Sequence, residues 1–88
     1  MICRQIIIFG SVQGVFFRYS AKIEAEKLFL IGYAKNLDDG SVEIMVCGEK
    51  EKVDKFIDWC STGPAMAKVE RVEVKEIEFQ KFKRFDIL

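Results

Sequence analysis

The stretch GSVQGVFFR, residues 10–18, combines two glycines with an arginine directly before a predicted helix. Because glycine has no Cβ, such a loop lets several backbone N–H groups turn toward one point, where they can hold an anion. The start of a helix adds unpaired N–H groups and a partial positive charge. Arg18 is unfavourable there unless an oxyanion lies between its guanidinium and the amides, and phosphate accepts the paired donors of a guanidinium. A plain glycine turn followed by a solvated Arg18 is the alternative.

The apolar spacing of the rest of the chain predicts the elements that position this loop. Runs and alternation of apolar residues indicate strands, and apolar residues three and four apart indicate amphipathic helices. The expected elements are strands over 6–9, 33–37, 42–47 and 69–75, an edge strand over 85–88, and helices over 18–30 and around 53–60. Gly32 is expected to end the first helix, and Asp39-Gly40 to turn a hairpin. Gly63 and Pro64 are expected to stop the second helix.

This order predicts fold class α+β, a ferredoxin-like βαββαβ sandwich with an antiparallel sheet and two helices on one face. The first two strands should be parallel, with the third strand antiparallel between them. The loop after the first strand and Asn36 would then fall at the same end of the sheet, roughly 10 Å apart. Asn near a hairpin often satisfies only turn backbone groups. Because Asp39-Gly40 already supply the turn, we favour a role for Asn36 at the loop.

Length, charge and missing residue types narrow the possible chemistry. The chain has 88 residues, which predicts a single domain over residues 1–88. It carries 14 basic and 14 acidic residues, so we expect no binding to nucleic acid or to an anionic membrane. There is no histidine and no cysteine pair with metal-ligand spacing, which argues against zinc and a His-based triad. The apolar run over 6–9 is too short for a signal peptide or a membrane span, so we expect a cytoplasmic protein.

The predicted sheet brings two of the three cysteines together. Cys3 lies near the start of the first strand and Cys47 at the end of the third, both on the face away from the helices. A disulfide between them could stabilise the fold by roughly 4 kcal/mol. Two reduced thiols that pack as small hydrophobes are the alternative. Cys60, Trp59 and most of the phenylalanines are expected in the core.

Three motifs together resemble the acylphosphatase family. They are GxVQGVxFR at 10–18, GYAKNLDDGSVE at 32–43, and Trp59 followed by GPxxAxV at 63–69, in order and at matching spacing. The resemblance implies the same ferredoxin-like sandwich. It also implies an enzyme, an acylphosphatase, that hydrolyses the carboxyl-phosphate bond of acyl phosphates without a metal or an organic cofactor.

The resemblance also implies roles for individual residues. Arg18 would be catalytic by binding the phosphate, and Asn36 would be catalytic by orienting the attacking water. The phosphate cradle would consist of Gly14, Val15, Phe16, Phe17 and Arg18. The partners would be a small-molecule acyl phosphate, with phosphate or sulfate as a competing anion, and the protein would be a monomer. Some bacterial members carry a cysteine pair at the positions of Cys3 and Cys47, which favours the disulfide.

The sequence departs from the family pattern at three positions. Ser11 stands where Arg is frequent, Phe29 replaces a Gly common near the end of the first helix, and Tyr33 stands where Trp is frequent. None of these changes removes Arg18 or Asn36. Ser11 could alter the charge around the acyl end of the substrate, so the substrate preference is put in question more than the reaction.

The implied reaction suits a chain without histidine. The leaving carboxylate has a conjugate acid with a pKa of about 4, so it departs without a proton donor. Phosphoryl transfer then depends mainly on positioning and on stabilising charge. RNA-recognition domains share the element order, but their RNP1 signature is absent from the strand VEIMVC. A regulatory phosphate-binding protein with little turnover would contain the same residues and is the second alternative.

Overall fold

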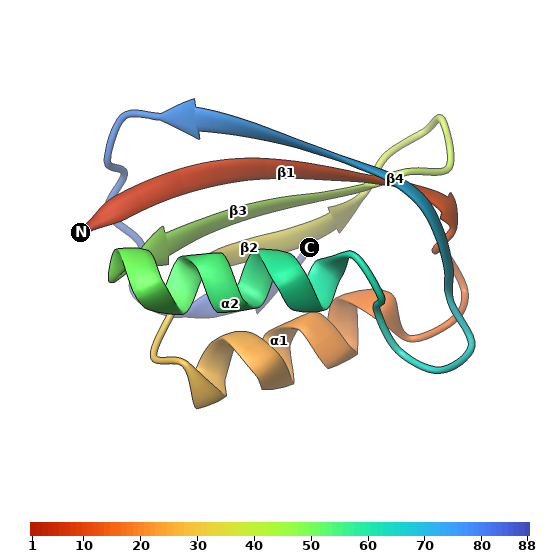
Figure 1. The fold of residues 1–88 in the computed structure, drawn as a ribbon, viewed down its shortest axis with the longest axis horizontal. Coiled ribbons are helices and arrows are strands. Elements are labelled where there is room, and N and C mark those ends of the chain that lie inside the picture. The colour runs from red at the N-terminus through yellow and green to blue at the C-terminus, as the bar shows by residue number, and fades with distance from the viewer.

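Alternating side chains of the long strands decide which face of the sheet is covered. In the first strand Ile6 and Ile8 are fully buried, whereas Gln5 and Ile7 point to the other face. The computed structural model describes residues 1–88, and both helices lie against the same face of the sheet (Figure 1). The elements are β1 (Ile2–Ser11), α1 (Phe17–Lys27), β2 (Ile31–Asn36), β3 (Val42–Gly48), α2 (Lys50–Cys60), β4 (Lys68–Ile77) and β5 (Phe85–Ile87).

The sheet has the strand order β4-β1-β3-β2-β5. β3 lies antiparallel between β1 and β2, and β4 pairs antiparallel with β1, which confirms the predicted ferredoxin-like α+β fold. β5 pairs with β2 in parallel, so the expectation of a wholly antiparallel sheet is wrong at this edge. The cause is the chain after β4, which crosses to the free edge of β2. There Gly32 N–H donates to Arg84 O at 3.0 Å, and Leu88 N–H donates to Ala34 O at 2.9 Å.

Apolar residues of the helices pack on β3 to form the core. The fully buried members from these elements are Ala21 and Ala25 of α1, Val53, Phe56 and Cys60 of α2, and Val42, Ile44 and Val46 of β3. Burial raises the pKa of the Cys60 thiol, as expected for a core cysteine. The expectation that most phenylalanines are buried is wrong, because of eight only Phe17, Phe56 and Phe85 are. Neither helix is long and apolar enough to span a membrane.

The first helix ends at Lys27, earlier than predicted, and Gly32 lies inside β2. The Phe29 N–H donates to Glu26 O at 3.1 Å and the Leu30 N–H to Ala25 O at 2.9 Å. This is the Schellman pattern, which requires a left-handed residue just after the helix. Phe29 takes that conformation with φ 57°. The prediction failed because a phenylalanine gives no sign of a conformation that glycine usually supplies.

The Phe29→Gly variant is expected to be more stable by about 0.5–1 kcal/mol, because it removes the left-handed strain and loses little burial. The Phe29 side chain is 84% exposed, so little packing is at stake. Thermal unfolding should show a Tm increase of about 3–6 °C. Phe29→Ala is the matched control, since it removes the same ring and keeps the strain. Equal gains from both variants would contradict the explanation.

Cys3 and Cys47 face each other in the β1–β3 register and are joined by a disulfide. Both residues are buried, because the segment between β4 and β5 runs across this end of the sheet (Figure 1). The N–H of Gln80 in this segment lies 3.3 Å from Cys3 Sγ. The disulfide favoured by the family resemblance is therefore present in the structure.

Removing the disulfide is expected to lower the free energy of unfolding by up to about 4 kcal/mol, because the bridge closes a loop with a sequence separation of 44 residues. Urea unfolding of wild type and of the Cys3→Ser/Cys47→Ser variant measures the difference. Reductant should destabilise wild type and leave the double variant unchanged. Titration of three free thiols in the unfolded, unreduced protein would contradict the bridge.

The face of the sheet away from the helices, on which Cys3 and Cys47 lie, also carries a network of polar side chains. The Tyr33 hydroxyl donates to Glu43 Oε1 at 2.9 Å, and Gln5 Nε2 donates to Glu43 Oε2 at 2.9 Å. Burial raises the pKa of Tyr33 to about 12, and the hydrogen bond and charge of Glu43 add to this effect. Tyr33 of β2 is thus bonded to Glu43 of the neighbouring strand β3.

Candidate active site

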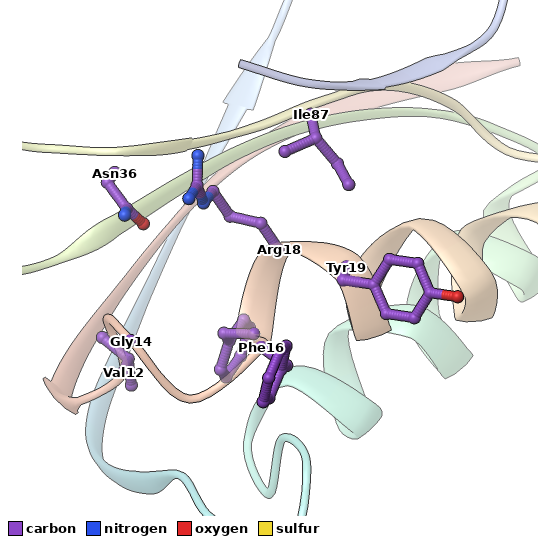
Figure 2. Close-up of a pocket in the computed structure, with 8 residues that line it drawn as sticks. Val12, Gly14, Phe16, Arg18, Tyr19, Asn36 and Ile87 are labelled. Atoms are coloured by element: carbon purple, nitrogen blue, oxygen red, sulfur yellow. The ribbon is translucent and has the colours of Figure 1, made fainter.

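The loop after β1 and the end of β2 meet at a cavity of about 270 Å³ (Figure 2). It is lined by Val12, Gly14, Phe16, Phe17, Arg18, Tyr19, Asn36 and Ile87. The structure therefore brings together most of the residues predicted for the site. Val15 is the exception among them, because it packs against the hydrophobic core instead of lining the cavity. Ser11 does not line the cavity and pairs with Lys68 at the end of β1.

The backbone N–H groups of residues 14–19 have no acceptor within the protein. The first hydrogen bond into α1 runs from the Ser20 N–H to Phe16 O at 3.0 Å. Phe16 occupies the N-cap with φ 62°, and no side chain caps the helix. The first turn also contains no acidic residue. Uncapped helix N-termini combine free donors with a partial positive charge, so this end of the cavity suits an anion.

Two adjacent phenylalanines give the loop its shape. Phe17 is buried and packs against Trp59, with ring centroids 5.4 Å apart, and against Gly63 at the end of α2. Phe16 precedes it and is 73% exposed. Gly14 has φ 76°, and a Cβ there would meet no atom within 4 Å, so this position needs glycine for its conformation and not for space. The loop is thus anchored at Phe17 and turns at Gly14.

The Arg18 side chain reaches from the first turn of α1 toward the strand that carries Asn36 (Figure 2). Its Nη1 donates to the backbone oxygen of Leu88 at 2.6 Å. One turn later, Lys22 Nζ donates to Phe85 O, so the same helix contacts β5 and the residue that follows it. A guanidinium has five N–H donors, and this contact leaves most of them free.

Asn36 is the last residue of β2, and its side chain makes no hydrogen bond within the protein. The turn that follows is satisfied by other groups. Asp39 accepts from the Ser41 N–H at 2.9 Å and from the Ser41 hydroxyl, and these bonds lower the pKa of Asp39. Gly40 N–H donates to Leu37 O at 3.2 Å. The alternative in which the Asn36 side chain bonds to backbone groups of the turn is therefore wrong. Its amide lines the cavity without a hydrogen-bond partner from the protein.

Gln13 connects the loop to this hairpin. Its Nε2 donates to Leu37 O at 2.8 Å and to Ser41 O at 2.9 Å. Both carbonyls belong to the ends of the turn between β2 and β3, directly after Asn36. A single side chain thus fixes the distance between the loop and the strand end that complete the cavity.

The cavity contains no carboxylate, thiol or imidazole. Its polar side chains are those of Arg18, Tyr19 and Asn36. The three groups with displaced pKa values, Tyr33, Asp39 and Cys60, do not line it. No group of three or more His, Cys, Asp or Glu side chains occurs that could hold a metal ion. The arrangement can bind and orient a small anion, and it contains no histidine, carboxylate or lysine side chain to transfer a proton.

The acylphosphatase family model matches residues 4–87. The chain belongs to the acylphosphatase family. An acylphosphatase of Vibrio parahaemolyticus serotype O3:K6 is 48% identical over 86 residues, which cover 98% of this chain and 96% of that relative. One of Acaryochloris marina is 46% identical over 88 residues, covering 100% and 95%. The crystal structure of acylphosphatase from Bacillus subtilis matches with a TM-score of 0.97 at 38% identity, covering 100% of this chain and 99% of that one.

Membership in the family confirms the enzyme class and the reaction expected from the sequence, which is the hydrolysis of acyl phosphates. The chain is an enzyme of the acylphosphatase type, and its substrates are small-molecule acyl phosphates. The RNA-recognition alternative is wrong, since the whole chain matches acylphosphatases. Sequence reasoning missed a role for Gln13, although this residue lies inside the motif that carried the resemblance. The signal was its place beside Gly14, where a long amide side chain can reach the neighbouring strand end.

Replacing Gln13 by Ala is expected to lower kcat for acyl phosphate hydrolysis by about 10- to 100-fold, because small displacements between reacting groups have effects of this size. The variant loses both bonds to the hairpin carbonyls. Initial rates over a range of substrate concentrations separate kcat from KM.

Gln5→Ala is the matched control, because Gln5 is bonded to Glu43 on the opposite face of the sheet. It should leave kcat within about twofold of wild type. Equal losses in both variants, or a Gln13→Ala variant with wild-type kcat, would contradict the positioning role.

Proposed function

We propose that this enzyme hydrolyses acyl phosphates by holding the phosphoryl group in a cradle of backbone amides and Arg18, with a water oriented by Asn36 and without a metal. The residues of the cradle are Gly14, Val15, Phe16, Phe17 and Arg18. The observation that carries the proposal is the run of N–H groups over residues 14–19 that lack acceptors beside a cavity lined by Arg18 and Asn36.

The cradle suits the charge of the reacting group. An acyl phosphate carries its negative charge on the non-bridging oxygens, and these oxygens keep that charge in the transition state. The amides and the start of α1 supply fixed dipoles directed at this charge, and Arg18 adds a full positive charge. These donors are held by the fold before substrate binds, so they need little reorganisation during the reaction. Their positive charge also removes the need for a metal ion.

Asn36 is suited to orient the nucleophile. Its amide has both donors and an acceptor, and none is used within the protein. It lies at the end of β2, across the cavity from the loop. A water bound there can face the phosphorus atom on the side opposite the departing carboxylate, as an in-line displacement requires.

The leaving group explains why the cavity needs no acid. A carboxylate with a conjugate-acid pKa of about 4 departs as an anion at neutral pH. The proton of the attacking water has no carboxylate or imidazole to accept it among the lining residues, so it passes to the phosphate oxygens or to solvent. The products are a carboxylate and inorganic phosphate. Inorganic phosphate, like sulfate, is expected to compete with the substrate for the cradle. The monomeric state and the cytoplasmic location stay predictions from the sequence.

Hydrolysis of benzoyl phosphate by wild type, Arg18→Ala and Asn36→Ala, each with a chelator present, tests this division of roles. Arg18→Ala is expected to lose at least about 1,000-fold in kcat/KM together with thermal stabilisation by inorganic phosphate. Asn36→Ala is expected to lose about 100- to 1,000-fold in kcat and to keep that stabilisation, because it orients the water and does not hold the phosphate. Thermal shift assays in phosphate measure the second readout.

Arg71→Ala and Asp38→Ala are the controls. Arg71 stacks on Phe9 and does not line the cavity, and Asp38 is an exposed residue of the hairpin. Both variants should keep wild-type rates. Loss of wild-type activity on adding chelator would contradict metal independence. Phosphate-dependent stabilisation of wild type without turnover above the buffer rate would favour a regulatory phosphate-binding protein instead.

A further inference from the structure

One side of the cavity is apolar and exposed without an evident structural reason. Phe16, Tyr19 and Ile87 line it and are 73%, 58% and 40% exposed. Phe17 anchors the loop, and the amides of the cradle belong to the backbone, so these three side chains are not needed to hold a phosphate. Large apolar side chains that gather around a small cavity are typical of a binding surface.

The reaction geometry directs the acyl group of the substrate toward this side. This step rests on the proposed function, in which Asn36 orients the water. In an in-line displacement the water and the leaving carboxylate lie on opposite sides of phosphorus. Asn36 and Tyr19 lie on opposite sides of the Arg18 side chain, and Phe16 lies below it in the same view (Figure 2). The leaving group therefore points away from Asn36 and toward the aromatic residues.

Charge restricts the acyl group further. Arg18 is the only charged side chain that lines the cavity, and the phosphoryl group uses it. Ser11, at the end of β1, does not line the cavity either. A second carboxylate on the substrate would lose hydration against Phe16 and Tyr19 without gaining a cation, which is unfavourable.

We propose that Phe16, Tyr19 and Ile87 form a subsite for an uncharged, apolar acyl group, preferably a flat ring. The cavity volume of about 270 Å³ is close to the lower end of the range of roughly 300–1,000 Å³ that is typical of small-molecule sites, so it suits a small substrate. A ring attached to the phosphoryl group would lie against the exposed side chains of Phe16 and Tyr19. The preferred substrates are thus aromatic or short aliphatic acyl phosphates, and acyl phosphates of dicarboxylic acids are poor substrates.

Kinetics with benzoyl, acetyl and succinyl phosphate test the subsite. KM is expected to be lowest for benzoyl phosphate and highest for succinyl phosphate. In Tyr19→Ala the ratio of kcat/KM for benzoyl phosphate to that for acetyl phosphate should fall by about 3- to 10-fold, less than an enclosed pocket would give, because the wall is half exposed. In Tyr19→Lys the ratio for succinyl to acetyl phosphate should rise. Dividing each value by wild type removes differences in leaving-group reactivity.

Ile23→Ala is the matched control. Ile23 lies one turn further along α1 and is 38% exposed, but it does not line the cavity. This variant should leave all three substrate ratios unchanged. A wild type that hydrolyses succinyl phosphate with the lowest KM, or equal changes of the ratios in Tyr19→Ala and Ile23→Ala, would overturn the subsite while the proposed function stands. Hydrolysis of none of the three compounds would instead overturn the proposed function.

Discussion

The site depends on backbone donors that the fold leaves unpaired. Helices often satisfy a first-turn N–H group with a capping side chain, and acidic residues in the first turn stabilise them through the partial positive charge there. In this chain the N-cap of α1 is Phe16 in a left-handed conformation, and the helix begins with a phenylalanine and an arginine, so neither device is present. By the residue preferences of helix N-termini, these residues are unfavourable at the start of a helix. They are understandable if an anion completes the structure, since a bound oxyanion accepts the donors and neutralises Arg18.

The surrounding fold holds these donors through a few contacts distant in sequence. Phe17 is packed against Trp59 of α2, which fixes the depth of the loop. Gln13 bonds both ends of the β2–β3 turn, which fixes the distance from the loop to Asn36. The strand order matters equally, because β3 between β1 and β2 places the loop and Asn36 at the same end of the sheet. A preorganised site thus arises from an 88-residue chain without a metal-binding cluster or a histidine.

Much of this arrangement could be predicted from the sequence, and the failures have physical reasons. Periodicity and the βαββαβ order predicted that the loop before Arg18 and Asn36 would lie at the same end of the sheet, because connection rules leave few topologies. Periodicity does not report backbone conformation, so it missed the left-handed Phe29 and the early end of α1. It also does not report what a polar side chain bonds to, so the role of Gln13 became visible only with its two acceptors. The number of buried phenylalanines was overestimated, because composition does not show which aromatic side chains the fold leaves exposed.

The strand at the end of the chain was expected from the sequence, but its three residues do not show that it pairs in parallel with β2, where it shapes the site. A strand this short is marginal by itself and depends on partners. β2 provides backbone pairing, and α1 adds contacts from Lys22 to Phe85 O and from Arg18 to Leu88 O. Arg18 therefore both lines the cavity and supports the strand that carries Ile87. Because its guanidinium has donors to spare, an anion can bind without breaking the contact to Leu88. The contact instead limits the rotation of Arg18, which keeps its remaining donors directed at the cavity and lowers the entropy lost when an anion binds.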